Sequence, residues 1–354
     1  MNEANDKAFL YQALDLAKIR RGFCAPNPSV GALIVRDGKV LTTGYHYAAG
    51  LPHAEINALE NLQETAKDAT IYVTLEPCCH FGRTPPCTNA LIAAGIKRVV
   101  YGYRDPNPII AGKGEENLLS ENIEVLHLPL PEIDQFYASY RFWHQNHRPF
   151  ITAKLAMTLD GKIAGPNAQP IQITAKEINQ FTHEARKRSD AILSTAKTII
   201  QDDPQLNVRL DKEIIAKPLY ILDSHLNLPL NAQIFKTANS ITIFHAKNAP
   251  AARLEALQAL GANCIHIEST SKGLNLTQVI EIIGKAGVHD LWIEAGSHCF
   301  NAFLHQGLLN RALLYIAPWA IGAGIPAFTT PIDFRNAQIS WQSYGKDVLC
   351  EILW

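Results

Sequence analysis

Helical and extended patterns alternate through the first 130 positions of this 354-residue chain, and this alternation limits what it can fold into. The predicted elements are, in order, a helix over 6–20, a strand over 30–35, a helix from Ala54, a strand over 71–75, a helix over 89–94, a strand over 98–103, a helix over 114–122 and a strand over 123–128. Such an order is typical of a layered α/β fold.

A second alternating region begins after a stretch without clean periodicity, YASYRFWHQNHRP at 137–149. Its predicted strands cover 150–157, 191–194, 218–223, 241–245 and 291–294, and its predicted helices cover 174–187, 251–260 and 276–285. No repeat of fixed period links the two regions. We therefore expect two different α/β domains, 1–146 and 147–354, that meet near His147.

Charge and hydropathy exclude several classes of protein. The chain has 32 Lys and Arg against 33 Asp and Glu, and it lacks the long basic block that nucleic-acid binding favours. The uncharged stretch 312–332 approaches the roughly 20 residues of a membrane helix, but its five Pro and Gly residues favour a strand at 313–317 followed by a loop. The N-terminus lacks the pattern of a secretory signal. We expect a cytoplasmic enzyme of small molecules, with no nucleic-acid or membrane partner.

Cysteine and histidine positions predict a metal site. The chain has seven cysteines, an odd number that disfavours a disulfide framework in a protein without an export signal. His53 and Glu55 open a predicted helix, Cys78 follows a predicted strand, and Cys87 ends the loop CCHFGRTPPC. Three ligands, His53, Cys78 and Cys87, would leave the fourth position of zinc to water, as in catalytic sites.

Glu55 lies two positions from a ligand and suits proton transfer. Zinc lowers the pKa of bound water from about 15.7 to about 7, and the resulting hydroxide needs a neighbouring acid/base group. The order H-x-E and then P-C is the pattern of zinc deaminases, although the loop between Cys78 and Cys87 is longer than their usual two residues. Alternatively, Cys78, Cys79, His80 and Cys87 form a structural zinc knuckle and His53 is an ordinary surface residue.

Two further segments leave their interpretation open. Asn27, between two prolines, either presents its amide to a planar ring or belongs to an ordinary turn. The second region has no G-x-G-x-x-G fingerprint, and its strand 291–294 followed by Gly296 and a helical run is only a weak phosphate-binding signal. Arg186, Arg188 and Arg209 either bind a phosphate or belong to a solvated helix face.

Longer motifs carry a family resemblance over nearly the whole chain. PNPSVGALIV, GYHYAAGLPHAE, TLEPCCHFGRTPPC and RDPNPIIAGKG in the first region, and LAMTLDGKIA, ILDS and WIEAGSHCF in the second, resemble the bifunctional riboflavin-biosynthesis deaminase/reductases. The resemblance implies a cytidine-deaminase-like α/β/α domain followed by a dihydrofolate-reductase-like α/β domain. It also implies Zn²⁺ and NADPH as cofactors and a homodimer or larger homo-oligomer.

The implied activity has two steps. The first domain would deaminate 2,5-diamino-6-(5-phosphoribosylamino)pyrimidin-4(3H)-one to 5-amino-6-(5-phosphoribosylamino)uracil, and the second would reduce its ribosyl group to ribityl with NADPH. Two alternatives stay open: a zinc-dependent deaminase of another nucleobase with an inactive reductase-like domain, and a non-enzymatic zinc-stabilised binding protein.

The resemblance also implies residues for the second site. Cofactor positions are Ala156, Thr198, Asp202, Ser224, Gly296, Ser297, His298, Cys299, Phe300, Asn301 and Ala302. Substrate positions are Arg186, Leu206, Arg209 and Glu294, and Asn27 in the first domain. Lys154 either donates a proton to the sugar oxygen or is an ordinary strand lysine. Pro170 and Gln172 replace a Ser-x-Trp found in relatives, so contacts at these two positions are in doubt.

Overall fold

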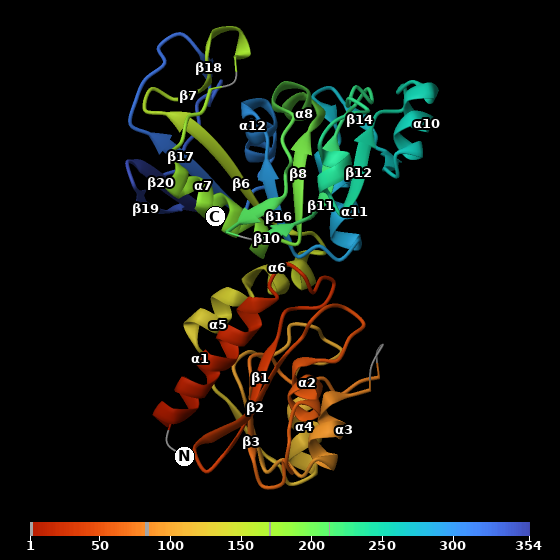
Figure 1. Ribbon diagram of the computed structural model, residues 1–354, viewed down its shortest axis with the longest axis vertical. Coiled ribbons are helices and arrows are strands. Elements are labelled where there is room, and N and C mark those ends of the chain that lie inside the picture. The colour runs from red at the N-terminus through yellow and green to blue at the C-terminus, as the bar shows by residue number, and fades with distance from the viewer. Residues whose placement is uncertain (1–2, 82–84, 170, 212) are drawn as a thin grey trace. The chain divides into compact units, whose positions relative to one another are not determined.

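The computed structural model describes residues 3–81, 85–169, 171–211 and 213–354, so Pro170 lies outside the described residues. The chain forms two compact units, Met1–His147 and Arg148–Trp354. Each unit has its own sheet and its own buried core (Figure 1).

The first unit contains a five-stranded sheet in the order β2-β1-β3-β4-β5. Its strands are β1 Gly31–Arg36, β2 Lys39–Tyr45, β3 Thr70–Val73, β4 Arg98–Tyr101 and β5 Glu124–His127. Its helices are α1 Glu3–Ile19, α2 Ala54–Glu60, α3 Cys87–Ala93, α4 Lys113–Ser120, α5 Pro131–Phe136 and α6 Ala138–Asn146. β1 runs antiparallel to β2 and β3, whereas β3, β4 and β5 are parallel.

Helices cover both faces of this sheet, and two glycines show how closely they approach. A Cβ atom on Gly31 would lie 2.1 Å from the carbonyl oxygen of Ala13 in α1, and one on Gly44 would lie 2.3 Å from the backbone nitrogen of Ala58 in α2. Gly44 pairs with Ala32, the neighbour of Gly31, and neighbours along a strand point to opposite faces. α1 and α2 therefore pack on opposite faces, which gives an α/β/α unit.

The stretch at 137–149, which shows no clean periodicity in sequence, is mostly helical. It forms α6, and its buried residues Tyr137 and Tyr140 recur at helical spacing with Trp143 and His144. Tyr140 packs its ring edge-on against that of His144, one turn later, at 4.7 Å. The helical period of the apolar residues is hard to see in the sequence. Polar residues lie among the aromatic ones, and both polar and aromatic residues occur on the buried side and on the exposed side of the helix.

The second unit contains a nine-stranded sheet in the order β13-β12-β11-β8-β16-β6-β17-β20-β19. These strands are β6 Phe150–Thr158, β8 Ala191–Thr195, β11 Pro218–Leu222, β12 Ser240–His245, β13 Asn263–His266, β16 Asp290–Glu294, β17 Arg311–Ala317, β19 Gln338–Tyr344 and β20 Asp347–Leu353. The seven strands from β13 to β17 are parallel, and the hairpin β19–β20 is antiparallel.

Both faces of the parallel part are buried. Along β16, Leu291 and Ile293 belong to one hydrophobic cluster and Trp292 belongs to another. The helices are α7 Lys176–Arg188, α8 Ala196–Asp202, α9 Ile234–Thr237, α10 Ala251–Ala259, α11 Leu276–Lys285 and α12 Ser297–His305, with a 3₁₀ turn at Pro166–Ala168. Three small antiparallel pairings complete the unit. Two are hairpins, β9 Val208–Leu210 with β10 Glu213–Ile215 and β14 Ser269–Thr270 with β15 Gly273–Leu274, and the third joins the distant strands β7 Lys162–Ala164 and β18 Ile325–Pro326.

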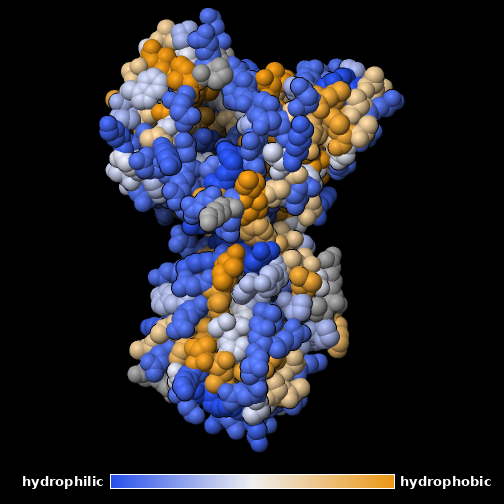
Figure 2. Space-filling view, viewed as in Figure 1, coloured by the Kyte–Doolittle hydropathy of each residue, from blue (hydrophilic) through white to orange (hydrophobic). Residues whose placement is uncertain are grey.

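The surface is mainly polar (Figure 2), and the uncharged stretch 312–332 forms the predicted strand followed by a loop. On the face drawn in Figure 2, each unit is mainly hydrophilic, and its apolar side chains lie in several separate patches. The uncharged stretch 312–332 contributes most of β17 and then leaves the sheet as a loop. Among the residues that the structure describes, none of the helices has the length and hydropathy that crossing a membrane requires.

Candidate active sites

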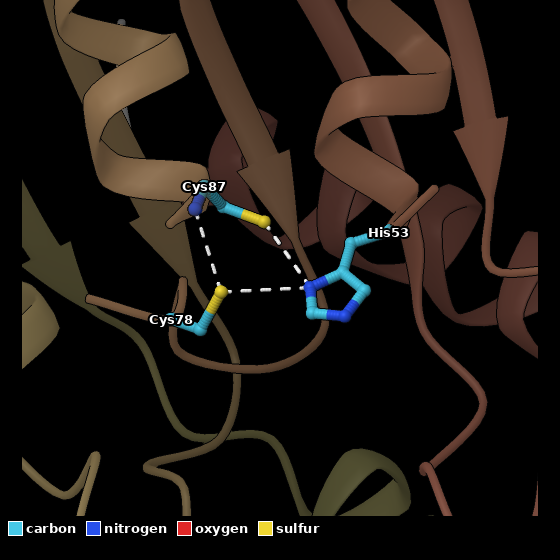
Figure 3. A group of neighbouring side chains, drawn as sticks. All are labelled: His53, Cys78 and Cys87. Carbon is cyan, nitrogen blue, oxygen red and sulfur yellow. Dashed lines mark hydrogen bonds between the residues drawn. The ribbon is translucent and has the colours of Figure 1, made fainter. Parts of the chain in front are cut away.

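Three predicted metal ligands converge at one edge of the first sheet. His53 directly precedes α2, Cys78 lies in the loop after β3, and Cys87 begins α3. The Nδ1 atom of His53 lies 3.5 Å from Sγ of Cys78 and 3.3 Å from Sγ of Cys87 (Figure 3). Zinc bonds of about 2.3 Å to sulfur and about 2.0 Å to nitrogen place tetrahedral ligand atoms roughly 3.5 Å apart. The donor set therefore fits a zinc ion.

The four-ligand knuckle is not the arrangement found. Among the described His, Cys, Asp and Glu residues, only His53, Cys78 and Cys87 form a group able to hold a metal ion. Cys79 and His80 are half-buried and stand outside this group. Nδ1 of His80 is buried and has no hydrogen-bond partner among the described residues.

Glu55 lies in the first turn of α2, beside the ligands. It is 3 % exposed, and this burial raises the pKa of its carboxyl group to about 7, although the neighbouring His53 opposes the rise. The carboxyl group of Glu55 also makes a side-chain hydrogen bond with the thiol of Cys87, and this contact acts to lower the pKa of Glu55. Contacts with Cys87 and His53 lower the pKa of the Cys78 thiol, which favours its thiolate form.

Glu76, two positions before Cys78, fixes the loop that follows β4. Its buried carboxylate accepts hydrogen bonds from the backbone N–H groups of Asp105, Gly112, Gly114 and Glu115 at 3.1–3.4 Å. Gly114 is required there, because a Cβ atom would lie 2.2 Å from the carbonyl oxygen of Pro77. The sequence analysis assigned no role to Glu76, which stands in the same TLEPCC motif as Cys78.

Asn27 and His46 lie beside the proposed metal ligands, because the ring of His46 packs edge-on against that of His53 with a centroid distance of 5.3 Å. Nδ2 of Asn27 lies 3.1 Å from Nε2 of His46, and Nδ1 of His46 lies 3.0 Å from the carbonyl oxygen of Pro52. The carbonyl oxygen of Pro52 can only accept, so Nδ1 carries the proton and Nε2 accepts from the amide of Asn27. Among the described residues, the amide oxygen of Asn27 has no hydrogen-bond partner. His46, 1 % exposed, was missed by sequence reasoning.

In the second unit, a buried ion pair lies at the carboxyl end of β16. Arg186 of α7 donates Nε to Oε1 of Glu294 at 2.5 Å and Nη2 to Oε2 at 2.9 Å. Its Nη1 donates to the carbonyl oxygen of Asn207 at 2.7 Å, and Trp292 donates to Glu294 at 2.7 Å. These three bonds use three of the five N–H donors of Arg186, so one N–H group on Nη1 and one on Nη2 stay available for a substrate oxygen.

Lys154 adjoins this pair in the strand register. It lies opposite Glu294 between β6 and β16, and its ammonium group lies 5.3 Å from the centre of the Tyr315 ring. Burial lowers the pKa of Lys154, with Glu294 acting in the opposite direction. Burial also acts to raise the pKa of Glu294, but Arg186 outweighs it and holds that pKa at about 2.

The other positions expected in the second site follow the carboxyl ends of parallel strands. Thr198 and Asp202 lie in α8 after β8, Ser224 follows β11, Gly296–Ala302 follow β16 and begin α12, and Ala156 lies in β6. Leu206 is buried, and Arg209 lies in β9, where it donates to Oδ1 of Asn207 at 2.5 Å. Ligands of open α/β sheets bind at such an edge.

Gln172, which replaces the tryptophan of relatives, lies near a tryptophan that the sequence analysis did not single out. Gln172 is exposed and donates its amide to the carbonyl oxygen of Thr174 at 2.9 Å. Trp319, in the loop after β17, donates its indole N–H to the carbonyl oxygen of Ile173 at 3.1 Å and remains 37 % exposed. A tryptophan from another segment therefore lies beside the position where relatives carry one.

Comparison with known proteins agrees with this geometry. Residues 3–103 match the family model of the cytidine and deoxycytidylate deaminase zinc-binding region, and residues 149–350 match that of the RibD C-terminal domain. The fold and the site thus define a zinc-dependent deaminase joined to a reductase. The chain belongs to the RibD family of bifunctional riboflavin-biosynthesis enzymes. The expected family, fold, paired activities and cofactors, Zn²⁺ and NADPH, are confirmed.

Three relatives illustrate the similarity. The riboflavin biosynthesis protein RibD of Aquifex aeolicus is 40% identical over 90% of this chain and 89% of its own length. The structure of Acinetobacter baumannii RibD is 32% identical, with a TM-score of 0.87 and 99% of both chains covered. A Thermotoga maritima diaminohydroxyphosphoribosylaminopyrimidine deaminase/5-amino-6-(5-phosphoribosylamino)uracil reductase is 30% identical, with a TM-score of 0.85 and 99% of both chains covered.

Proposed function

We propose that the unit Met1–His147 deaminates 2,5-diamino-6-(5-phosphoribosylamino)pyrimidin-4(3H)-one at its 2-amino group. We propose further that the unit Arg148–Trp354 then reduces the ribosyl group of the product to ribityl with NADPH. The observation that carries the first step is the convergence of one imidazole and two thiol groups beside a buried carboxyl group. Family membership supports the second step.

In the deaminase, His53, Cys78 and Cys87 would hold the zinc ion, which supplies Lewis-acid activation of water. Glu55 is the catalytic acid/base: it accepts a proton at its carboxylate and delivers protons to the ring nitrogen and then to the departing ammonia. Asn27, whose amide nitrogen is committed to His46, accepts a hydrogen bond from an N–H group of the pyrimidine through Oδ1. His46 is a positioning residue for Asn27.

In the reductase, conversion of ribosyl to ribityl adds a hydride to C1′ and a proton to O4′ as the C1′–O4′ bond opens. Bound NADPH supplies the hydride. Lys154, a charged donor between Glu294 and Tyr315, delivers the proton to O4′. Glu294 keeps Lys154 and Arg186 in place and contributes with Arg209 and Leu206 to the substrate site. The remaining cofactor positions are those at the carboxyl edge: Ala156, Thr198, Asp202, Ser224 and Gly296–Ala302.

Location and assembly complete the proposal. The metal-binding thiols must stay reduced, and all seven cysteines are free, which supports a reducing compartment such as the cytoplasm. We assign homodimer assembly to the second unit, where the edge strand β19 exposes Ile339 and Trp341 and pairs with only one neighbour, β20. Size measurement by sedimentation tests this assembly.

The deciding experiment measures ammonia release and NADPH oxidation by the purified zinc-loaded chain with the diaminopyrimidine substrate. We expect Glu55→Gln to lose ammonia release by about 10²–10⁴-fold, the usual contribution of general acid–base catalysis, and to lose NADPH oxidation with it. Zinc content should stay at the wild-type level, because Glu55 is not a ligand. Glu60→Gln, an exposed change on the same helix, is the matched control.

The outcomes separate the proposed steps. If Glu55→Gln oxidises NADPH at the wild-type rate, the reductase accepts the undeaminated compound and the proposed order is wrong. If the wild type releases ammonia but never oxidises NADPH, the chain is a deaminase with an inactive reductase-like unit. Adding 5-amino-6-(5-phosphoribosylamino)uracil directly to Glu55→Gln should restore NADPH oxidation.

A further inference from the structure

A small hydrophobic cluster surrounds the proposed thiol ligands of the first unit. Ile110 packs with Cys78 and Cys87, and Ile56 of α2 packs against these three residues. This cluster is separate from the main core of the unit. Ile110 is 6 % exposed, whereas its neighbour Ile109 is 56 % exposed. A side chain from the segment between β4 and α4 therefore covers part of the thiol pair.

The segment that carries Ile110 is closed by one carboxylate oxygen. Oε2 of Glu76 accepts the backbone N–H of Asp105 at 3.3 Å and that of Gly112 at 3.1 Å, so it binds both ends of the segment 105–112. Oε1 accepts two N–H groups in the first turn of α4 at 3.1 and 3.4 Å. A carboxylate is favourable at this end of a helix, where the N–H groups lack partners within the helix. One buried side chain thus fixes the segment and the helix that follows it.

The remaining hydrogen bonds of the segment are mostly local. The N–H of Asn107 donates to Oδ1 of Asp105 at 2.8 Å, and the N–H of Ile110 donates to the carbonyl oxygen of Asn107 at 2.8 Å. Among the described side chains outside the segment, only Glu76 and Tyr140 form hydrogen bonds with it, and Tyr140 does so at 3.4 Å. The position of the segment therefore depends chiefly on Glu76.

We infer that Glu76 is a positioning residue of the deaminase, which holds the segment 105–112 so that Ile110 stays packed against Cys78 and Cys87. The inference rests on the proposed deamination. An apolar shell around a metal site limits the access of water to the ligands, and changes in such outer contacts typically cost about 10–100-fold in metal affinity or activity. Glu76 is not part of the group of described residues able to hold a metal ion, so it acts through the segment.

Zinc release measures this covering without relying on turnover. The full-length zinc-loaded wild type, Glu76→Gln and Ile110→Ala would be mixed with an excess of a chromogenic chelator. An amide has one acceptor oxygen, so Glu76→Gln leaves two of the four N–H groups without an acceptor and loosens the segment. We expect both variants to release zinc about ten-fold faster or more. The double variant should release zinc no faster than Ile110→Ala, because both changes remove the same contact.

Steady-state ammonia release separates positioning from substrate binding. Ile110 packs on the thiol groups, so a loosened segment disturbs the reacting centre and leaves the binding of the substrate intact. We therefore expect Glu76→Gln and Ile110→Ala to lower kcat by about ten-fold or more and to leave KM unchanged.

Asp6→Asn is the matched control. The carboxylate of Asp6 is also buried, and it accepts hydrogen bonds from Tyr72 at 2.6 Å and Arg98 at 2.8 Å. Arg98 begins β4, whereas Cys78 follows the end of the parallel strand β3, so this contact lies toward the opposite edge of the sheet. Asp6→Asn should lower the urea midpoint of the first unit and leave zinc release and kcat unchanged.

The results distinguish positioning from a general loss of stability. Zinc release by Glu76→Gln at the wild-type rate, release by Asp6→Asn as fast as by Glu76→Gln, or effects of Glu76→Gln and Ile110→Ala that multiply in the double variant would overturn the inference. If Glu76→Gln fails to fold, unchanged zinc release and kcat in Ile110→Ala alone would overturn it. A wild type that retains no zinc or releases no ammonia from the diaminopyrimidine would instead overturn the proposed deaminase function.

Discussion

The ion pair between Arg186 and Glu294 offers the sharpest test of how the second unit is stabilised. The two side chains are 10 % and 12 % exposed and are joined by two nearly parallel hydrogen bonds. Changing Arg186 to Met or Glu294 to Gln leaves the other group buried without its charged partner. Removing one partner of a buried pair typically costs about 3–5 kcal/mol.

The pKa of Glu294 agrees with this expectation in direction. Burial acts to raise this pKa, but Arg186, together with Lys154 and Trp292, holds it at about 2, below the ordinary value of 4.5. A double-mutant cycle with Arg186→Met and Glu294→Gln should therefore give a coupling energy of about 3 kcal/mol. The exposed pair Arg188–Glu184, on the same helix, is the matched control and should give less than about 0.5 kcal/mol.

Urea unfolding monitored by tryptophan fluorescence measures these energies. Four of the five tryptophans lie in the second unit, and Trp143 is the single one in the first, so a Trp143→Phe background reports on the second unit alone. If the two single changes add within about 0.5 kcal/mol, the residues are not coupled, and the argument from geometry is wrong.

Three further predictions use the same unfolding assay. The pKa of Glu294 in the folded state lies below its value in the unfolded state, so the ionised carboxylate stabilises the fold above pH 4.5 and this stabilisation is lost as pH falls toward 2. The free energy of unfolding of the second unit should therefore fall by about 3 kcal/mol over this range. Glu294→Gln should remove this pH dependence. Gly114→Ala should destabilise the first unit by about 1–3 kcal/mol, measured with Trp143 as the only fluorophore, and an unchanged midpoint would contradict the tight contact with Pro77. Chelation of zinc should lower the urea midpoint of the first unit, since metal binds only the folded ligand set, and should leave the second unit unchanged. A shift of both midpoints would place the metal elsewhere.

The proposed metal ligands could be predicted because their signal is local in sequence. His53, Glu55, Cys78 and Cys87 have the spacing and the flanking elements of one known chemistry. The nearby contacts were harder to predict because they depend on tertiary structure. Glu76 is one acidic residue in an apolar run, and nothing in its spacing indicates that four backbone N–H groups converge on it.

The strand β2 was missed although the chain marks it. Asp37-Gly38 is a strong signal for a two-residue hairpin turn, and both residues adopt positive φ angles, 53° and 76°. The alternation that should identify β2 is weak, because five of its seven residues are partly or fully exposed and polar or glycine residues interrupt its apolar positions. The same reason applies to β19, whose first six residues are all exposed.

The missed hairpin explains why the first site is assembled where it is. β1 runs antiparallel to both β2 and β3, so the beginning of β1, the end of β2 and the end of β3 meet at one edge of the sheet. Asn27 precedes β1, His46 follows β2, and Cys78 follows β3. Asn27 and Cys78 are about 50 positions apart in the sequence, and the directions of β1, β2 and β3 are sufficient to bring them to the same edge of the sheet. Reversing β1 in a hypothetical all-parallel sheet would move Asn27 to the far edge. The antiparallel hairpin is therefore what allows one edge to hold both the proposed metal ligands and the Asn27 amide that we propose faces the substrate.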